Sequence, residues 1–344
     1  MSPRLHEHVR ALLSTREAEL RAWGRVIAIV FGTLVVVLVV TALSYSYAFG
    51  PAGVPQERPE FVISPGETLY TVATRLEDEG LVKYAAAFRF AYGITRGERT
   101  LRPGGYELSP GMDALQIAKK LGEAPYLTWV SIPEGRRKEE VADILRETLG
   151  WTAEERQQWL VATEAMPDMT EGVFFPDTYL IPSDQPPSQV VARLRGRFED
   201  AVAPYAVEAL EEGKEWKEVI TLASLIEREA GRNDKRLVAG ILYNRLEKGM
   251  PLQVDATLQY VAGKDNDWWP IPDVEVKDVD SPFNTYVYKG LPPEPIATPS
   301  LDSIEAALTP QSTKCLYYLH DAYGRIHCAT TYAAHKANVN RYLR

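Results

Sequence analysis

The longest apolar stretch of the chain runs from Val26 to Ala48 and holds no charged side chain. As a helix, this segment would reach about 34 Å, which is enough to cross a hydrocarbon core of about 30 Å. A cleaved signal peptide is the alternative, because Ser46-Tyr47-Ala48 is similar to a cleavage site, but the apolar run is too long and starts too far along the chain. We therefore expect an uncleaved transmembrane helix over residues 26–48.

The charged residues beside this segment predict its orientation. Residues 1–25 carry five arginines against three glutamates, whereas Arg58 is the only basic residue among the first twenty after residue 48. The positive-inside rule then makes residues 1–25 a cytoplasmic tail. We expect a single-pass protein of the cell (inner or plasma) membrane, with a linker over residues 49–60 and everything beyond it outside the cytoplasm.

Downstream of the linker, one pattern of apolar residues occurs three times. In each copy an apolar strand runs into a turn with proline and glycine, and the helix that follows has apolar residues at i, i+1 and i+4 that can pack on the strand. The turns are Pro65-Gly66, Pro110-Gly111 and Pro133-Glu134-Gly135, and the apolar positions are Val72, Ala73 and Leu76; Ile117, Ala118 and Leu121; and Val141, Ala142 and Leu145. The unequal spacing of the copies excludes a stacked repeat array.

The first two copies predict a small α+β subdomain over residues 61–124. It would comprise a strand, a helix from Thr68, a second helix over residues 84–92 and a return strand at Tyr106. This order resembles the LysM-like glycan-binding module, and the alternative is a spacer without a ligand. Residues 125–344 then form a second domain of mixed α/β structure, so the fold class is α+β.

Three helices can be delimited in the second domain. Thr152 opens one of them with a capping box, Ser188 is expected to cap another that runs toward Val202, and residues 216–230 form the third. The third helix carries Glu227 and Glu229 at opposite margins of its apolar face.

These two glutamates differ in their neighbours. Glu227 lies among small residues, which leave room for a ligand, whereas Glu229 lies beside Leu222 and Leu225. A carboxyl group in the first setting is expected to have a raised pKa and to act as a general acid. Surface hydrogen bonding is the alternative for both glutamates.

Composition and motifs exclude several classes of protein. The formal net charge of −9, without a dense basic stretch, argues against nucleic acid as a partner. The chain has no Walker-type, GxGxxG, GxSxG or SxxK motif, so we expect no nucleotide cofactor and no serine acyl transfer. A metal site built from His320, His327, Cys315 and Cys328 would have irregular spacing, and we expect neither a metal nor another cofactor.

Five blocks in the carboxyl-terminal half, in this order, resemble the endolytic murein transglycosylases (MltG/YceG-like), and the resemblance extends from residue 26 to the end. The blocks are Glu171-Gly172-Val173-Phe174-Phe175-Pro176-Asp177-Thr178-Tyr179; Ala223-Ser224-Leu225-Ile226-Glu227-Arg228-Glu229; Tyr243-Asn244-Arg245-Leu246 with Gly249-Met250; Leu252-Gln253-Val254-Asp255-Ala256-Thr257; and Phe283-Asn284-Thr285-Tyr286 running to Gly290-Leu291-Pro292-Pro293.

The resemblance implies a lytic transglycosylase whose catalytic domain is residues 125–344. Such an enzyme cleaves peptidoglycan between N-acetylmuramic acid and N-acetylglucosamine without water and leaves a 1,6-anhydro end. It implies Glu227 as the catalytic acid and Glu229 as a supporting residue. The other expected residues are substrate contacts, Gln253, Asp255, Asn284 and Tyr286, and supporting residues, Asp177 and Tyr179.

The chain departs from the family pattern in three places. The usual Pro-Pro-Gly-Pro-Ile reads Pro292-Pro293-Glu294-Pro295-Ile296, and the usual Asn-Pro-Gly reads Thr298-Pro299-Ser300. Either these positions never needed a positive φ, or the loop has a different shape. The terminal Glu-His-Asn pattern is reduced to Ala334-His335-Lys336, so His335 is expected to pack rather than to react.

The two cysteines fall in a predicted hairpin, with strands over residues 315–320 and 325–330. If Cys315 and Cys328 lie opposite each other, they can form a disulfide outside the cytoplasm. The alternative is two small buried side chains beneath the hairpin.

Peptidoglycan glycan strands and the membrane are the expected partners, together with peptidoglycan polymerases or divisome proteins. The resemblance also implies that cleavage limits the length of nascent strands. The alternative from another class is a non-catalytic peptidoglycan-binding scaffold of the cell-wall synthesis machinery.

Overall fold

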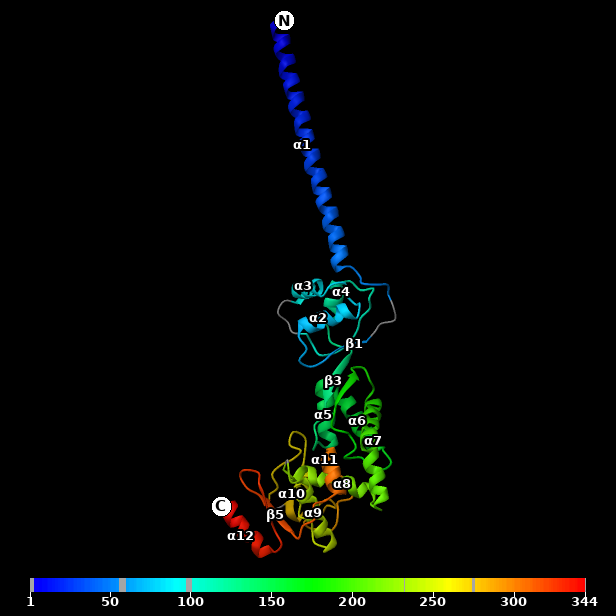
Figure 1. Ribbon diagram of the computed structural model, residues 1–344, viewed down its shortest axis with the longest axis vertical. Helices are drawn as coiled ribbons and strands as arrows, with labels where there is room; N and C mark the ends of the chain where they lie inside the picture. Colours follow the sequence, from blue (N-terminus) through cyan, green and yellow to red (C-terminus); the bar gives the residue numbers. More distant parts are fainter. Residues whose placement is uncertain (1–2, 56–59, 97–100, 232, 274–275, 344) are drawn as a thin grey trace. The chain divides into compact units, whose positions relative to one another are not determined.

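The computed structural model describes residues 3–55, 60–96, 101–231, 233–273 and 276–343 (Figure 1). The chain divides into two compact units between Tyr126 and Leu127, close to the boundary expected after residue 124. The expected linker over residues 49–60 falls partly outside the described residues.

The first helix, α1, runs from Pro3 to Phe49. Its segment Trp23–Phe49 is long and apolar enough to cross a membrane, and an 18-residue window within it has a mean hydropathy of 3.0. The hydroxyl groups of Thr33 and Thr41 inside this segment donate to the carbonyl groups of Ile29 and Val37. Each hydroxyl is thereby satisfied within the helix, which suits an apolar surrounding.

The remainder of the first unit follows the predicted order of strand, two helices and strand. Its elements are β1 (Glu60–Ile63), α2 (Leu69–Asp78), α3 (Ala85–Arg96), β2 (Gly104–Glu107) and α4 (Ala114–Lys120). Strands β1 and β2 are antiparallel, with Phe61 opposite Tyr106, and both side chains are buried in one core. Thr68 caps α2 as expected.

The strand-turn-helix pattern is confirmed in all three copies. The third copy is β3 (Leu127–Ser131) followed by α5 (Lys138–Leu149) in the second unit. The nine apolar helix positions named above are all 0% exposed. The pattern therefore marks the helix faces that bury against their strands.

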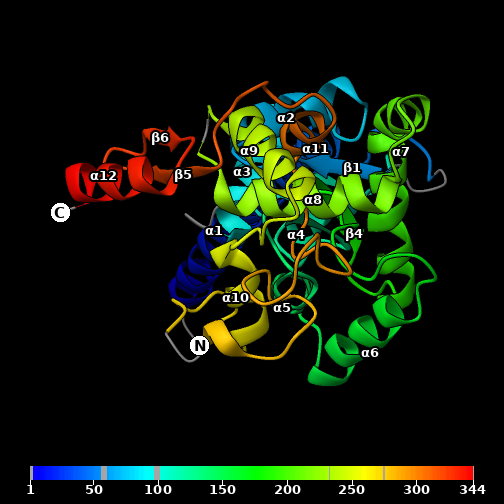
Figure 2. The ribbon, with the colours of Figure 1, turned by 90° about the horizontal axis from the view of Figure 1, so that it is seen from below.

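The second unit is mostly helical. After α5 its elements are α6 (Ala153–Glu164), β4 (Thr178–Pro182), α7 (Pro187–Glu211), α8 (Trp216–Glu229), α9 (Lys235–Glu247), α10 (Asp255–Ala262), η1 (Val276–Asp278), α11 (Leu301–Leu308), β5 (Tyr317–His320), β6 (Ile326–Ala329) and α12 (Tyr332–Tyr342). Strands β3 and β4 pair antiparallel, as do β5 and β6. Helix α12 packs on the β5–β6 hairpin, at the edge of the unit in Figure 2.

The expected cap of α7 is wrong. The helix begins at Pro187 with Pro186 as its N-cap, so Ser188 lies inside it and caps nothing. A proline at the first helical position has a suitable φ and lacks an N–H group that would need a partner. The helix also continues past Val202 to Glu211, whereas the capping box at Thr152 is confirmed at the start of α6.

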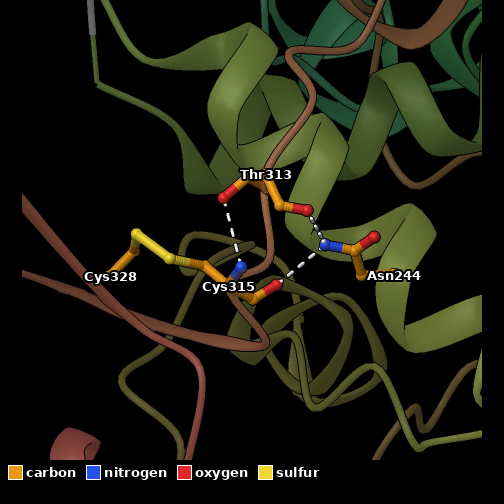
Figure 3. Close-up of a disulfide and its surroundings, with 4 residues drawn as sticks. All are labelled: Asn244, Thr313, Cys315 and Cys328. Carbon is orange, nitrogen blue, oxygen red and sulfur yellow. Dashed lines mark hydrogen bonds between the residues drawn. A yellow bond between two sulfur atoms is a disulfide. The ribbon is translucent and has the colours of Figure 1, made fainter.

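The hairpin contains the disulfide Cys315–Cys328 (Figure 3). Of the two alternatives left open by the sequence, the structure has the disulfide, but the cysteines are not directly opposite each other, because Cys328 lies opposite Tyr318 and Cys315 precedes β5. The segment around Cys315 is instead held by Asn244, whose side-chain amide donates to the carbonyl groups of Thr313 and Cys315 at 2.9 and 3.0 Å. The disulfide joins this fixed segment to β6.

Breaking the disulfide should lower the free energy of unfolding of the second unit by about 3 kcal/mol, because the reduced unfolded chain gains freedom. The comparison is the Cys315→Ser/Cys328→Ser protein against the oxidised wild type, with unfolding followed by tryptophan fluorescence. Six of the seven tryptophans lie beyond residue 126, so the signal reports this unit. Equal unfolding midpoints would contradict the prediction.

Candidate active site

The middle of helix α8 is buried on all sides rather than on one face. Every residue from Val219 to Ile226 is buried, and the helix packs against α7, α9, α10 and α11 (Figure 2). The single apolar face expected from the sequence is therefore only part of its buried surface. The helix ends at Glu229, so both glutamates lie in its last turn, at the edge of the core.

Glu227 is surrounded by hydrogen-bond donors from two other segments. Its Oε2 accepts from the Ser300 backbone N–H at 2.9 Å, from the Ser300 hydroxyl at 2.5 Å and from the Ser303 hydroxyl at 2.6 Å. Lys235 Nζ lies 3.1 Å from the same oxygen and also donates to Ser300 Oγ at 2.8 Å. The side chain of Glu227 is only 7% exposed.

The pKa of Glu227 is lowered, and the expectation that it would be raised is wrong. Burial by itself raises the pKa, but the hydrogen bonds from Ser300 and Ser303 and the charge of Lys235 outweigh it. Hydrogen bonds to a carboxylate favour its charged form. In the unliganded site Glu227 is therefore a carboxylate held by hydroxyl groups and one ammonium group.

The loop that supplies Ser300 was not recognised from the sequence as part of the site. Ser300 has a φ of −74° and caps α11, and neither it nor Glu294 has a positive φ. The two positions where the family has glycine therefore do not need glycine here. The serine hydroxyl and the amino-terminal end of α11 both stabilise the negative charge of Glu227.

The turn of the third strand-turn-helix copy lies against Glu227. Gly135 has a φ of 71°, and a Cβ atom there would lie 3.8 Å from Glu227 Cγ. Its N–H donates to the Thr298 carbonyl at 2.8 Å, and the Thr298 N–H donates to the Arg136 carbonyl at 2.8 Å. The turn and the Ser300 loop are thus joined, and one side of Glu227 is lined by backbone.

Glu229 belongs to a second cluster. Its carboxylate accepts from the Tyr318 hydroxyl at 2.8 Å and from the Ala256 N–H at 3.3 Å, and the Tyr286 hydroxyl donates to Asp255. Burial and the nearby charge of Asp255 raise the pKa of Glu229, in spite of these hydrogen bonds. The two glutamates of α8 therefore have pKa values shifted in opposite directions.

Gln253 is exposed and has an unusual backbone conformation, with a φ of 51°. Its N–H donates to the Thr285 carbonyl and the Val254 N–H to the Thr285 hydroxyl, both at 3.0 Å. A non-glycine residue with positive φ costs free energy and is often found at functional sites. The structure thus brings Gln253, Asp255 and Tyr286 to adjoining segments.

Asn284 does not face a ligand. It is 0% exposed, and its amide donates to the carbonyl groups of Lys277 and Val279 while its oxygen accepts from the Tyr286 N–H. The interpretation of Asn284 as a direct substrate contact is therefore replaced by a role in ordering the loop that carries Tyr286.

Asp177 and Tyr179, at β4, have hydrogen-bond partners outside the two glutamate clusters. Asp177 accepts from Arg197 Nε at 2.9 Å, and the buried Tyr179 donates to the Phe175 carbonyl at 2.6 Å. The block Tyr243-Asn244-Arg245 is likewise engaged with backbone, since Arg245 donates to the Leu316 and Leu252 carbonyl groups. These contacts tie β4 to α7, and α9 to the segments around Leu252 and Leu316.

The histidines and cysteines of the hairpin have separate partners. The cysteines are joined to each other, His320 bonds to Asp234 at 2.9 Å, and His327 bonds to Asp321 at 2.9 Å. His335 stacks on Tyr317, with 5.5 Å between the ring centroids.

A nearly buried carboxylate among hydroxyl donors, with the exposed Gln253 and Asp255 at a segment that packs on the same helix, is typical of enzymes that use acid and base catalysis. The YceG-like family model matches residues 61–341, and the chain belongs to this family.

Curated relatives carry the same description as one another. An endolytic murein transglycosylase of Bacillus subtilis (strain 168) is 30% identical over 307 residues, which cover 82% of this chain and 84% of that protein. An endolytic murein transglycosylase of Streptococcus pneumoniae serotype 2 (strain D39) is 27% identical over 318 residues, and the match spans 58% of its length. A crystal structure of the yceG-like protein lmo1499 from Listeria monocytogenes matches with a TM-score of 0.56 and 29% identity, over 82% of this chain and 99% of that one.

Proposed function

We propose that this chain is a membrane-anchored lytic transglycosylase. It cleaves the bond between N-acetylmuramic acid and N-acetylglucosamine in peptidoglycan and leaves 1,6-anhydro ends. The observation that carries the proposal is Glu227, a nearly buried carboxylate held by two serine hydroxyl groups, a backbone N–H and the ammonium group of Lys235. The names of the curated relatives, endolytic murein transglycosylases, support the same activity.

One carboxyl group serves both halves of the reaction. Protonated Glu227 gives its proton to the departing glycosidic oxygen, the C6 hydroxyl of the sugar attacks the anomeric carbon, and the carboxylate then takes the proton of that hydroxyl. The entering strand excludes water, and the hydroxyl groups of Ser300 and Ser303 turn toward sugar oxygens. Both changes raise the pKa of Glu227 and favour its protonated form.

The second cluster holds the strand. Gln253, Asp255 and Tyr286 provide amide, carboxylate and phenol groups for sugar hydroxyl and acetamido groups. Glu229 supports this cluster through Tyr318 and the start of α10, and Asp177 and Tyr179 brace β4.

Helix α1 anchors the enzyme with its amino terminus in the cytoplasm and both units beyond it outside. The arginines of residues 1–25 and the Cys315–Cys328 disulfide support this orientation, because disulfides persist in oxidising compartments. The strand, two-helix and strand order of the first unit supports a LysM-like role in holding glycan. An enzyme anchored at this face of the membrane, close to polymerases or divisome proteins, would limit the length of nascent strands.

Mass spectrometry of purified glycan strands incubated with the protein tests the function. Anhydro ends identify a transglycosylase, and reducing ends identify a hydrolase. Unchanged strands would instead favour the non-catalytic scaffold.

The pH dependence of cleavage should respond to Ser300. Because Glu227 must be protonated for the first step, activity falls as the pH rises through its pKa. Ser300→Gly removes the hydroxyl donor but retains the backbone N–H and an acceptable helix cap. We expect the descending limb of kcat/KM to move up by roughly one pH unit. Ser300→Thr keeps the hydroxyl group and should leave the limb in place, and a limb that moves down in Ser300→Gly would contradict the assignment.

A further inference from the structure

A cavity of about 870 Å³ opens in the second unit, outside the two glutamate clusters. Its walls are α5, α6 and the segment Asp265–Trp269, and they include Asp143, Arg156, Gln157 and both tryptophans of that segment. We call it the tryptophan pocket. Its volume is in the range of sites that hold small organic ligands.

The two indole rings are fixed without a ligand. Trp268 Nε1 donates to Asp143 at 3.2 Å, and Trp269 Nε1 donates to Glu140 at 2.7 Å. The guanidinium group of Arg137 stacks on Trp268 at 4.8 Å, and that of Arg228 stacks on Trp269 at 3.8 Å. A platform whose rotamers are already set loses little entropy on binding.

The pocket begins beside the proposed catalytic carboxyl group. Arg136, in its wall, directly follows Gly135, which lines Glu227. Arg228, which directly follows Glu227, covers Trp269 and points one of its N–H groups at the Gly135 carbonyl, 3.4 Å away. A chain that passes Glu227 on this side therefore runs into the pocket.

The polar groups of the wall suit a neutral ligand. Arg136 pairs with Glu140 at 2.5 Å, and Arg156 pairs with Asp143 at 2.6 Å. Ion-paired side chains can still donate to and accept from hydroxyl and acetamido groups, but they have little net charge to attract an anion. Flat aromatic rings beside such groups are suited to the apolar face of a pyranose ring.

We propose that the tryptophan pocket binds sugar residues of the glycan strand on one side of the bond that is cleaved, with Trp268 as the stacking surface. This inference rests on the proposed function, and it adds a subsite and its ligand class. The indole ring and the paired charged side chains favour binding of the saccharide backbone over binding of a peptide stem.

The test is a titration of the full-length chain carrying Glu227→Gln, in detergent micelles, with the β-1,4-linked hexamer of N-acetylglucosamine. Calorimetry should show binding, and Trp268→Ala should weaken it by about tenfold or more, whereas Trp268→Phe keeps most of the affinity. Ala153→Phe fills the pocket from the exposed start of α6, does not touch the core, and should also abolish binding. Tyr323→Ala removes an exposed aromatic ring of the hairpin turn and should have no effect.

The proposal would be overturned if the Trp268→Ala and Ala153→Phe proteins bound the hexamer as tightly as the chain that carries Glu227→Gln alone. Binding of peptide-bearing strands without binding of the hexamer would also overturn it. The outcomes separate this inference from the proposed function. Hexamer binding that depends on Trp268, in a chain whose wild type releases no anhydro ends, supports the pocket and refutes the activity. Anhydro ends released with unchanged kcat/KM by Trp268→Ala support the activity and refute the pocket.

Discussion

Replacing Glu227 by glutamine should reduce the release of anhydro ends by about a thousandfold or more. The amide has nearly the same shape but can neither give a proton to the glycosidic oxygen nor take one from the C6 hydroxyl, so both halves of the reaction lose their catalyst. Mass spectrometry of strands incubated with wild-type and variant protein measures the loss. Binding of the strands should remain, since the other groups around the site are unchanged.

Glu229→Gln is the matched control, because it makes the same chemical change two residues later on α8. The raised pKa of Glu229 means that a neutral side chain is easily accommodated there, and we expect a much smaller loss. Wild-type rates in the Glu227 variant, or a larger loss in the Glu229 variant, would reverse the assignment of the two residues.

The apolar pattern was sufficient to predict the elements that bury one face. The three strand-turn-helix copies follow from i, i+1 and i+4 spacing because that spacing dictates which side of a helix leaves water. It was not sufficient for α8, where the residues outside the expected face are buried by helices far away in the sequence. It also failed at Ser188, because the proline before it satisfies the helix start by another route.

The site was predicted less completely than the fold. Glu227 could be singled out, but the sign of its pKa shift depends on Ser300, Ser303 and Lys235, which only the tertiary structure brings to it. Ser300 stood out in the sequence as a missing glycine, and a serine before a short apolar helix is itself a capping signal that marks its position. The sequence indicated that Cys315 and Cys328 could form a disulfide. It did not predict the register of the hairpin, because the turn lacks a two-residue signal that would fix which residues pair.

The buried carboxyl group of Glu171 contacts the start of α5 and so holds a segment that lines the candidate active site. Glu171 is 0% exposed, and the N–H of Lys138, the first residue of α5, lies 3.0 Å from both of its oxygens. This contact fixes the segment that follows Gly135, which lines Glu227. Burial, together with the charge of Glu139, raises the pKa of Glu171 to about 8, although backbone N–H groups oppose the shift.

This shift predicts how the stability of the second unit depends on pH. The pKa of this carboxyl group rises from 4.5 in the unfolded chain to about 8 in the folded protein. Its contribution to stability is therefore complete at a pH below 4.5. The contribution is lost as the pH rises through the folded pKa, and the loss amounts to roughly 5 kcal/mol for a fully buried group.

Glu171→Gln should remove most of this dependence, because the amide is neutral at every pH. We expect the variant to be no more stable than the wild type at pH 5 and clearly more stable at pH 9, so that the two stability curves cross. Denaturant unfolding of the full-length chain, followed by tryptophan fluorescence, measures both curves. Glu199→Gln, at an exposed position on α7, should reproduce the wild-type curve. Parallel curves for Glu171→Gln and wild type would show that Glu171 is ionised in the native protein and that the two backbone N–H groups of Lys138 and Gly172 outweigh its burial.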